Sequence, residues 1–272
     1  MGLTAFVLGG GGMLGAAEVG MLQSLADRGV EPDLILGTSV GAINGAAYAY
    51  RPGVEAAERL AQMWAELGSS DVFGGGIVSS LGTLARSSGT HLYNNHRLRA
   101  LLSDHVPASR FEDLAVPFQC VAACVERAAA HWFTAGPLAE AVLASCAVPG
   151  LLPAVQIGAE HFLDGGLVDS LPVSRALTLG ATEIYALHVG RLEQPLRTPR
   201  RPWEVASVAF EIARRSRFTD AMAALPPEVS VHVLPTGTER TPIANLRFRS
   251  NRQVPERIER ARAATAAYLQ RL

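Results

Sequence analysis

Short apolar runs alternate with longer segments of helical character along most of the chain. The apolar residues 3–8 and 34–36 each lead through a glycine-containing turn into such a segment. Two strand–turn–helix units in succession predict a parallel sheet. The predicted strands span residues 3–8, 34–36, 118–125, 161–163, 183–189 and 229–234, with 131–134 as a hairpin partner of the third. The predicted helices span residues 16–28, 42–50, 54–67, 94–105, 138–146, 173–179, 203–224 and 255–272.

Two segments interrupt this alternation. Residues 68–90 are rich in Gly and Ser and carry few charges, which predicts a loop or lid, and residues 148–157 form an apolar segment with two prolines. The stretch 190–202 is the best linker candidate, but only a short piece of chain follows it. We therefore expect a single domain over residues 1–272, with 203–272 as an extension packed on the same domain.

Composition narrows the class of protein. A hydrophobic share of 49% in 272 residues is ample for one well-buried core. The 24 basic residues nearly balance the 25 acidic ones, so no nucleic-acid partner is expected. The three cysteines have no metal-ligand spacing, and their odd number argues against a disulfide framework. Because no apolar run approaches the ~20 residues of a membrane-spanning helix and no basic leader is present, we expect a cytoplasmic location with at most peripheral membrane contact.

A candidate nucleophile lies between the second predicted strand and the helix after it. Gly37, Ser39 and Gly41 fit the pattern G-x-S-x-G in the strand–turn–helix context that the motif requires. Such a sharp turn strains the serine backbone, and the flanking glycines let neighbouring elements come close. The following helix directs its N-terminal dipole at any anion that develops there. The pentapeptide alone is weakly specific, but this context predicts a nucleophilic Ser39.

The glycine run at residues 9–12, followed by Gly15, forms a candidate anion site. Consecutive glycines can turn several backbone N–H groups toward one point, where a phosphate or the oxyanion of acyl transfer could sit. A plain flexible turn is the simpler interpretation. The same glycines also fit the dinucleotide fingerprint G-x-G-x-x-G with Asp33 downstream. In that fold the acidic residue ends the second strand, whereas Asp33 precedes it.

A serine nucleophile needs a base, and no histidine has an obvious catalytic context. His188, which ends a predicted strand, is a weak candidate among the seven histidines. Asp164 also ends a predicted strand, and the two glycines after it allow close backbone approach. Desolvation raises the proton affinity of a carboxylate, so Asp164 in a dry site could accept the Ser39 proton. Asp-Gly-Gly alone is more often a turn, and its value depends on the other two motifs.

Taken together and in this order, the three motifs resemble those of the patatin-like phospholipases over about residues 3–190. The matching blocks are residues 10–15, 37–41 and 164–166, with 42–44 and 144–150 agreeing around them. The resemblance implies a three-layer α/β/α fold with a mostly parallel central sheet, and a Ser–Asp dyad that works without histidine, metal or cofactor. By resemblance, Ser39 is the nucleophile, Asp164 is the base, the backbone N–H groups of Gly10, Gly11, Gly12 and Val40 form the oxyanion hole, and Gly15, Gly37, Gly41, Gly165 and Gly166 support these loops.

The function implied is hydrolysis of a lipid acyl ester (phospholipid, lysophospholipid or neutral ester) through an acyl-Ser39 intermediate. A non-catalytic lipid-binding or regulatory member of the family, an acyltransferase, and a dinucleotide-dependent oxidoreductase are the alternatives. Leu14 stands where the family usually has Arg or Lys, which makes neutral esters or thioesters more plausible, and Asp169 stands where Asn is expected.

Three segments are candidates for membrane contact. The helix 203–224 is better interpreted as a core helix with a solvated basic end, and the arginine-rich tail 247–272 as a solvated helix face. The loop 68–90 is the better candidate for an acyl-chain lid. The oligomeric state stays open.

Overall fold

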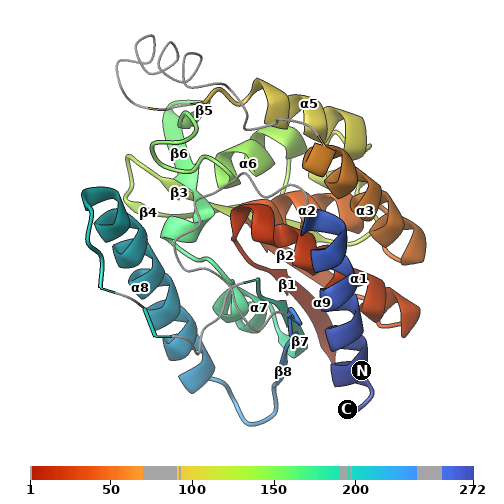
Figure 1. Ribbon diagram of the computed structural model, residues 1–272. Coiled ribbons are helices and arrows are strands. Elements are labelled where there is room, and N and C mark those ends of the chain that lie inside the picture. Colours follow the sequence, from red (N-terminus) through yellow and green to blue (C-terminus); the bar gives the residue numbers. More distant parts are fainter. Residues whose placement is uncertain (1, 70–90, 92, 190–194, 197, 238–252) are drawn as a thin grey trace.

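The computed structural model describes residues 2–69, 91, 93–189, 195–196, 198–237 and 253–272, and these form a sheet covered by helices on both faces (Figure 1). The strands lie in the order β5-β6-β3-β2-β1-β7-β8, and β4 pairs with β3 off this path. The strands are β1 (Leu3–Leu8), β2 (Leu34–Thr38), β3 (Phe118–Cys124), β4 (Ala129–Phe133), β5 (Val155–Ile157), β6 (Glu160–Asp164), β7 (Ala181–Leu187) and β8 (Ser230–Val233).

The central strands are parallel, as the sequence predicts. β3, β2, β1, β7 and β8 pair in parallel with their neighbours, whereas β4 and β6 pair antiparallel with β3, and β5 pairs antiparallel with β6. The parallel strands therefore end at one edge of the sheet, where the glycine turns follow β1 and β2. The antiparallel β6 starts beyond that edge and runs back along β3, and its last residue, Asp164, pairs with Ala122, one residue past the β3 residue that pairs with Thr38 at the end of β2.

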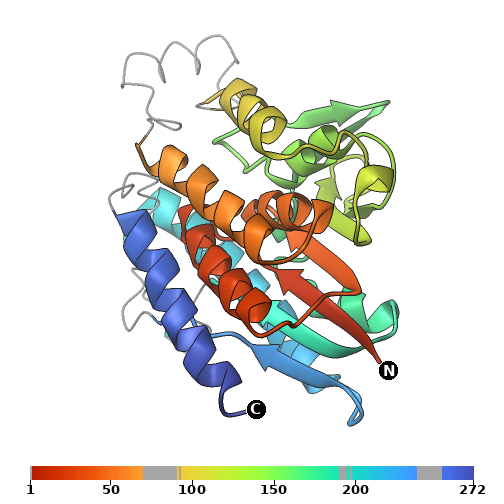
Figure 2. The same cartoon turned by 90° about the vertical axis from the view of Figure 1, so that its right-hand side faces the viewer.

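Helices cover both faces of the sheet, which confirms the three-layer α/β/α architecture. The helices are α1 (Ala16–Asp27), α2 (Val40–Tyr50), α3 (Val54–Ser69), α5 (His96–His105), α6 (Leu138–Ser145), α7 (Val173–Thr178), α8 (Pro202–Ala223) and α9 (Val254–Leu269), with short 3-10 turns η1 (Gly12–Gly15), η2 (Phe111–Asp113) and η3 (Gly165–Leu167). Figure 2 views the molecule from the side covered by α1, α3 and α9.

Alternate residues of the central strands enter two separate hydrophobic cores. Phe6 and Ile35 pack with the helices α1, α2, α3 and α9, while Val7 and Leu36 pack on the opposite face with α7 and Phe218 of α8. Because both faces are buried, the strands are continuously apolar rather than alternating. This explains why short apolar runs were the signal that located β1 and β2.

Helix α9 packs closely along α1. A Cβ atom on Gly20 of α1 would lie 2.1 Å from the carbonyl oxygen of Ile258, so only glycine allows this approach. Ser24 Oγ donates to the Arg262 carbonyl at 2.7 Å, and Arg262 Nη2 donates to Asp27 Oδ2 at 2.8 Å. Assignment of residues 1–272 to one domain stays a prediction.

Several sequence predictions differ from the structure. β5 lies within the proline-containing segment 148–157, where no strand was predicted, and it forms because Val155 pairs across a tight turn with Phe162. Helix α8 was expected to be a core helix with a solvated basic end, yet Arg214 and Arg215 pair with Glu211 one turn earlier and are mostly buried. Among the hydrophobic side chains of α8 that the structure describes, Val205 and Ile212 are exposed, at 52% and 55%.

Some predictions lie outside the described residues. The predicted lid 68–90 falls there almost entirely, as does much of the linker candidate 190–202. Within the described part of the chain, no helix is both long and apolar enough to cross a bilayer.

Candidate active site

Ser39 occupies a strained turn between β2 and α2. Its backbone angles are φ 56° and ψ −123°, in a region that residues with a side chain rarely adopt. A Cβ atom on Gly41 would lie 2.4 Å from the Leu8 carbonyl oxygen, and one on Gly37 would lie 2.6 Å from the Gly41 carbonyl oxygen. The two glycines of the motif therefore let α2 start directly against β1, with Ser39 held at the end of the sheet.

The structure brings the two predicted catalytic side chains together. Ser39 Oγ donates a hydrogen bond to Asp164 Oδ2 at 2.6 Å, and both residues are buried. Asp164 Oδ1 accepts from the Gly166 N–H at 2.7 Å, which fixes the carboxylate orientation. A Cβ atom on Gly165 would lie 2.1 Å from the Val121 carbonyl oxygen, so this glycine lets the loop after β6 pass against β3.

Burial changes the acidity of the groups in this site. Desolvation raises the pKa of Asp164 to about 6, and the hydrogen bonds from Ser39 and Gly166 limit the rise. Asp164 is therefore an ionised but more basic carboxylate at neutral pH. Burial also raises the pKa of the neighbouring Cys146 thiol well above its ordinary value, so this cysteine stays protonated and is a poor nucleophile.

The end of α6 holds the backbone of the strained turn. Ser145 Oγ accepts a hydrogen bond from the Ser39 N–H at 2.9 Å, and Cys146 Sγ donates to the Ser39 carbonyl oxygen at 3.1 Å. The Asp164 N–H donates to the Ala147 carbonyl oxygen at 2.9 Å. One short segment thus positions both members of the pair. Ser145 and Cys146 were not predicted as site residues, although they lie within residues 144–150, which agree with the patatin-like pattern.

Asn44 ties the helix after Ser39 to the glycine-rich loop. Its Nδ2 donates to the Gly15 carbonyl oxygen at 3.0 Å and to Glu18 Oε2 at 2.8 Å, and its Oδ1 accepts from Trp64 Nε1 at 2.9 Å. All four groups are buried. Burial raises the pKa of Glu18 well above its ordinary value and so favours its neutral form, while the hydrogen bond from Asn44 opposes that rise.

The glycine-rich loop lies directly against Ser39. A Cβ atom on Gly10 would be 3.4 Å from the Ser39 Cβ. The Gly10 N–H, however, donates to the Ser170 carbonyl oxygen at 2.9 Å, so this predicted oxyanion donor is already engaged. Gly11, Gly12 and Val40 have N–H groups at the starts of η1 and α2, where helices leave donors without intrahelical acceptors.

The other residues singled out by sequence have different surroundings. Asp33 Oδ2 accepts from the Thr4 N–H at 2.8 Å, at the amino ends of β1 and β2 and thus at the opposite edge from the glycine-rich loop. A ribose partner is needed beside that loop, so this position disfavours the dinucleotide interpretation. His188 stacks on Phe218, and within the described structure neither of its ring nitrogens has a hydrogen-bond partner. Burial lowers its pKa to about 3.

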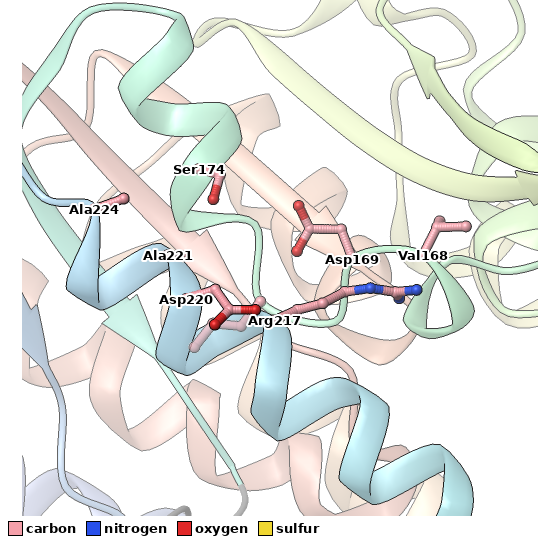
Figure 3. Close-up of a pocket in the computed structure, with 8 residues that line it drawn as sticks. Val168, Asp169, Ser174, Arg217, Asp220, Ala221 and Ala224 are labelled. Carbon is pink, nitrogen blue, oxygen red and sulfur yellow. The ribbon is translucent and has the colours of Figure 1, made fainter.

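A cavity of about 310 Å³ lies beside the loop that follows Asp164 (Figure 3). Arg217 extends from α8 toward this loop, where its guanidinium donates to the Leu167 carbonyl oxygen. Burial raises the pKa of Asp169 to about 6, and the charge of Arg217 limits the rise. The Asp169 carbonyl oxygen accepts from Thr38 Oγ1 at 2.9 Å, so its main chain supports the strand that carries Ser39. Neither Ser39 nor Asp164 lines this cavity.

Comparisons with known proteins find lysophospholipases and patatin-like phospholipases among the similar chains. The chain is 29% identical over 195 residues to "Lysophospholipase NTE1" of Mycosarcoma maydis, covering 69% of this chain and 10% of that protein. It is 31% identical over 194 residues to "Patatin-like phospholipase domain-containing protein 7" of Mus musculus, covering 70% of this chain and 14% of that protein. The chain therefore spans a small part of the length of these relatives.

Among solved structures, VipD from Legionella pneumophila aligns with a TM-score of 0.47 at 13% identity, covering 99% of this chain and 67% of that chain. The sequence model named "Patatin-like phospholipase" matches residues 6–177, which is more than half of the chain and includes all three glycine motifs. The chain belongs to the patatin-like phospholipase family.

Proposed function

We propose that this protein is a serine hydrolase of lipid acyl esters that uses Ser39 as the nucleophile and Asp164 as the general base. The observation that carries the proposal is the 2.6 Å hydrogen bond from Ser39 Oγ to Asp164 Oδ2, made between two buried side chains. A hydroxyl becomes a competent nucleophile when a base within hydrogen-bond distance removes its proton. Asp164 meets that requirement in distance and in acidity.

In the first half of the reaction, Ser39 Oγ attacks the ester carbonyl carbon as its proton passes to Asp164. The carbonyl oxygen becomes an oxyanion, and the N–H groups of Gly11, Gly12 and Val40 are the donors proposed to stabilise it, aided by the N-terminal dipole of α2. The intermediate then expels the alcohol, which takes the proton from Asp164. The product is an acyl ester on Ser39 with Asp164 again ionised.

In the second half, water replaces the serine hydroxyl as the group that Asp164 deprotonates. The hydroxide attacks the acyl carbonyl carbon, and Ser39 Oγ leaves with the proton that Asp164 holds. A carboxylic acid is released and the starting state is restored. This cycle is closed in atoms and protons and uses no metal or cofactor, as the resemblance implies.

The substrate class is proposed as lipid acyl esters. Relatives that carry the name lysophospholipase support a lysophospholipid or phospholipid. Residues 9–15 carry no charged side chain, which supports neutral esters equally well. An acyltransferase would use the same acyl-enzyme, and competition between water and an added alcohol distinguishes it from a hydrolase.

The direct test is intact-protein mass spectrometry after exposure to a long-chain alkyl fluorophosphonate. We expect one adduct on the wild-type chain and none on folded Ser39→Ala, because the reagent reports an activated serine without requiring the true substrate. Asp164→Asn, which retains the shape of the side chain, is expected to react very slowly. Absence of an adduct on folded wild-type protein would favour the non-catalytic alternative.

A further inference from the structure

The glycine-rich loop has no cation of its own, but the C-terminal helix brings one to it. Residues 9–15 are uncharged. Arg257 of α9, 244 residues away in sequence, donates from Nη1 to the Met13 carbonyl oxygen at 2.8 Å. The family match ends at residue 177, so this contact comes from a part of the chain outside the matched region.

The position of Arg257 in its helix is unfavourable for helix stability. It lies in the first turn of α9, where the helix dipole disfavours a positive charge. The guanidinium is also half-buried, and burial lowers its pKa, with a further contribution from Arg260. Both the helix dipole and burial disfavour a charged Arg257 at this position. Its hydrogen bond to the Met13 carbonyl oxygen is the contact that best explains why a cation is there.

That contact acts on the peptide groups that the proposed mechanism uses. Because the Met13 carbonyl points to Arg257, the N–H of the same peptide, on Leu14, points the other way and donates to the Gly11 carbonyl oxygen at 3.2 Å. The Gly11 carbonyl is thereby directed into η1. The Gly11 carbonyl and the Gly12 N–H belong to the same trans peptide group and point in opposite directions, so the Gly12 N–H points out of the turn.

We infer that Arg257 is a positioning residue that orients the Gly12 N–H for the oxyanion by fixing the Met13 carbonyl. The inference rests on the proposed function. Gly12 has a φ of 55°, so its peptide adopts this orientation only because glycine tolerates it. Glycine-rich backbone is also easily reoriented, and an external anchor on the next turn keeps the donor in place before substrate arrives.

The test compares Arg257→Ala with two control variants on the same helix. Arg260→Ala removes a surface arginine whose guanidinium pairs with Glu256 at 3.3 Å. Arg262→Ala removes the ion pair with Asp27 that helps to dock α9 on α1, without touching the loop. Each chain is assayed for hydrolysis of a soluble p-nitrophenyl ester and for the rate of Ser39 modification by an alkyl fluorophosphonate, and thermal melting verifies the fold.

We expect Arg257→Ala to lower kcat and the labelling rate by about 10- to 100-fold with little change in KM, which is less than the loss caused by removing a donor outright. The two controls are expected to stay within about twofold of the wild type, since surface and docking contacts do not act on the oxyanion. Arg257→Lys, which can still donate to one carbonyl, and added guanidinium with Arg257→Ala are each expected to restore part of the rate.

The outcomes separate this inference from the proposed function. Wild-type labelling at Ser39 together with an unchanged rate in folded Arg257→Ala would overturn the inference alone, whereas an unlabelled wild-type chain would overturn both. If Arg257→Ala does not fold, Arg257→Met keeps the apolar stem and carries the test. Loss of folding in both variants would replace the positioning role with a purely structural one.

Discussion

Asp164 has to be ionised to accept a proton from Ser39, and its buried position sets the pH at which this happens. Burial raises its pKa to about 6, while burial lowers that of His188 to about 3 and keeps this histidine neutral. We predict that the rate of Ser39 acylation rises with pH through about 6 and then levels off. The measurement is kcat/KM for a soluble ester against pH. If the rise of kcat/KM with pH disappeared in folded His188→Gln, its assignment to Asp164 would be wrong.

The same buried carboxylate should make the protein less stable at higher pH. The pKa of Asp164 rises from 3.8 to about 6 on folding, so the charged form is disfavoured in the native state. Its cost is absent below the lower pKa, where the group is protonated in both states, and complete above about pH 6. A difference of roughly 2 pKa units corresponds to about 3 kcal/mol.

Asp164→Asn is therefore expected to be inactive but more stable than the wild type by about 3 kcal/mol near pH 8, with the gain vanishing toward pH 4. The amide can still accept from Gly166 and donate to Ser39 Oγ. Asp169 has a similarly raised pKa but is present in both chains, so its contribution cancels. Denaturant unfolding at several pH values measures the difference, and a gain independent of pH would count against the explanation.

Ser39 and Asp164 could be proposed from sequence because each lies beside glycines, which allow the close backbone approach that an active-site turn requires. Ser145 and Cys146 could not, because a hydroxyl and a thiol at the end of an apolar helix have no distinctive pattern. Their contacts with Ser39 depend on the pairing of β3 with β6, which places the end of α6 beside the strained turn. Gly10 illustrates the converse: its motif is right, yet its N–H is bonded to Ser170.

At the scale of elements, the strained turn between β2 and α2 is held by a hydrogen bond between its backbone and the end of α6. Ser145→Ala leaves the buried Ser39 N–H without an acceptor, which costs about 1–3 kcal/mol. We predict this loss of stability together with a fall in kcat of about 10-fold, because the reactive hydroxyl loses its fixed orientation.

Cys146→Ala is the matched control at the same turn. It removes only a weak thiol donor to the Ser39 carbonyl, so its effects on the free energy of unfolding and on kcat are expected to be smaller. Urea unfolding and steady-state kinetics on both variants give the comparison. Equal effects of the two substitutions would mean that packing, rather than the hydrogen bond to Ser39, dominates.

Element identity followed well from periodicity, and element boundaries followed less well. β1 was predicted at the observed residues, since an apolar run that stops at a run of glycines has a clear end. β2 extends to Thr38 and α2 begins at Val40, leaving Ser39 alone as the turn, which is shorter than a five-residue glycine motif suggests. β5 was missed because pairing with β6 overrides the prolines nearby.

At the scale of the whole molecule, no sequence motif predicts the packing of α9 on α1. The tail was expected to be a solvated helix face, and its arginines do pair with acidic neighbours, but Val254, Ile258 and Leu269 are buried. The sequence feature that indicates this packing is Gly20 in the interior of α1, because glycine is normally disfavoured inside a helix. Gly20 marks the crossing point of the two helices.

Gly20→Ala tests how this packing connects to the active site. An added Cβ would lie 2.1 Å from the Ile258 carbonyl oxygen, so α9 must shift, and the expected destabilisation of about 1–3 kcal/mol outweighs the better helix propensity of alanine. Gln23→Ala, on the same helix but without that contact, should change stability by less than about 0.5 kcal/mol. Thermal and urea unfolding measure both.

A shift of α9 would also draw Arg257 away from the Met13 carbonyl, because both contacts belong to the first part of the same helix. We therefore expect Gly20→Ala to lose stability and kcat together, whereas Arg257→Ala loses kcat with little change in stability. Kinetics below the unfolding range of Gly20→Ala separate the two effects. Full kcat in a destabilised Gly20→Ala would mean that α9 stabilises the fold without influencing the glycine-rich loop.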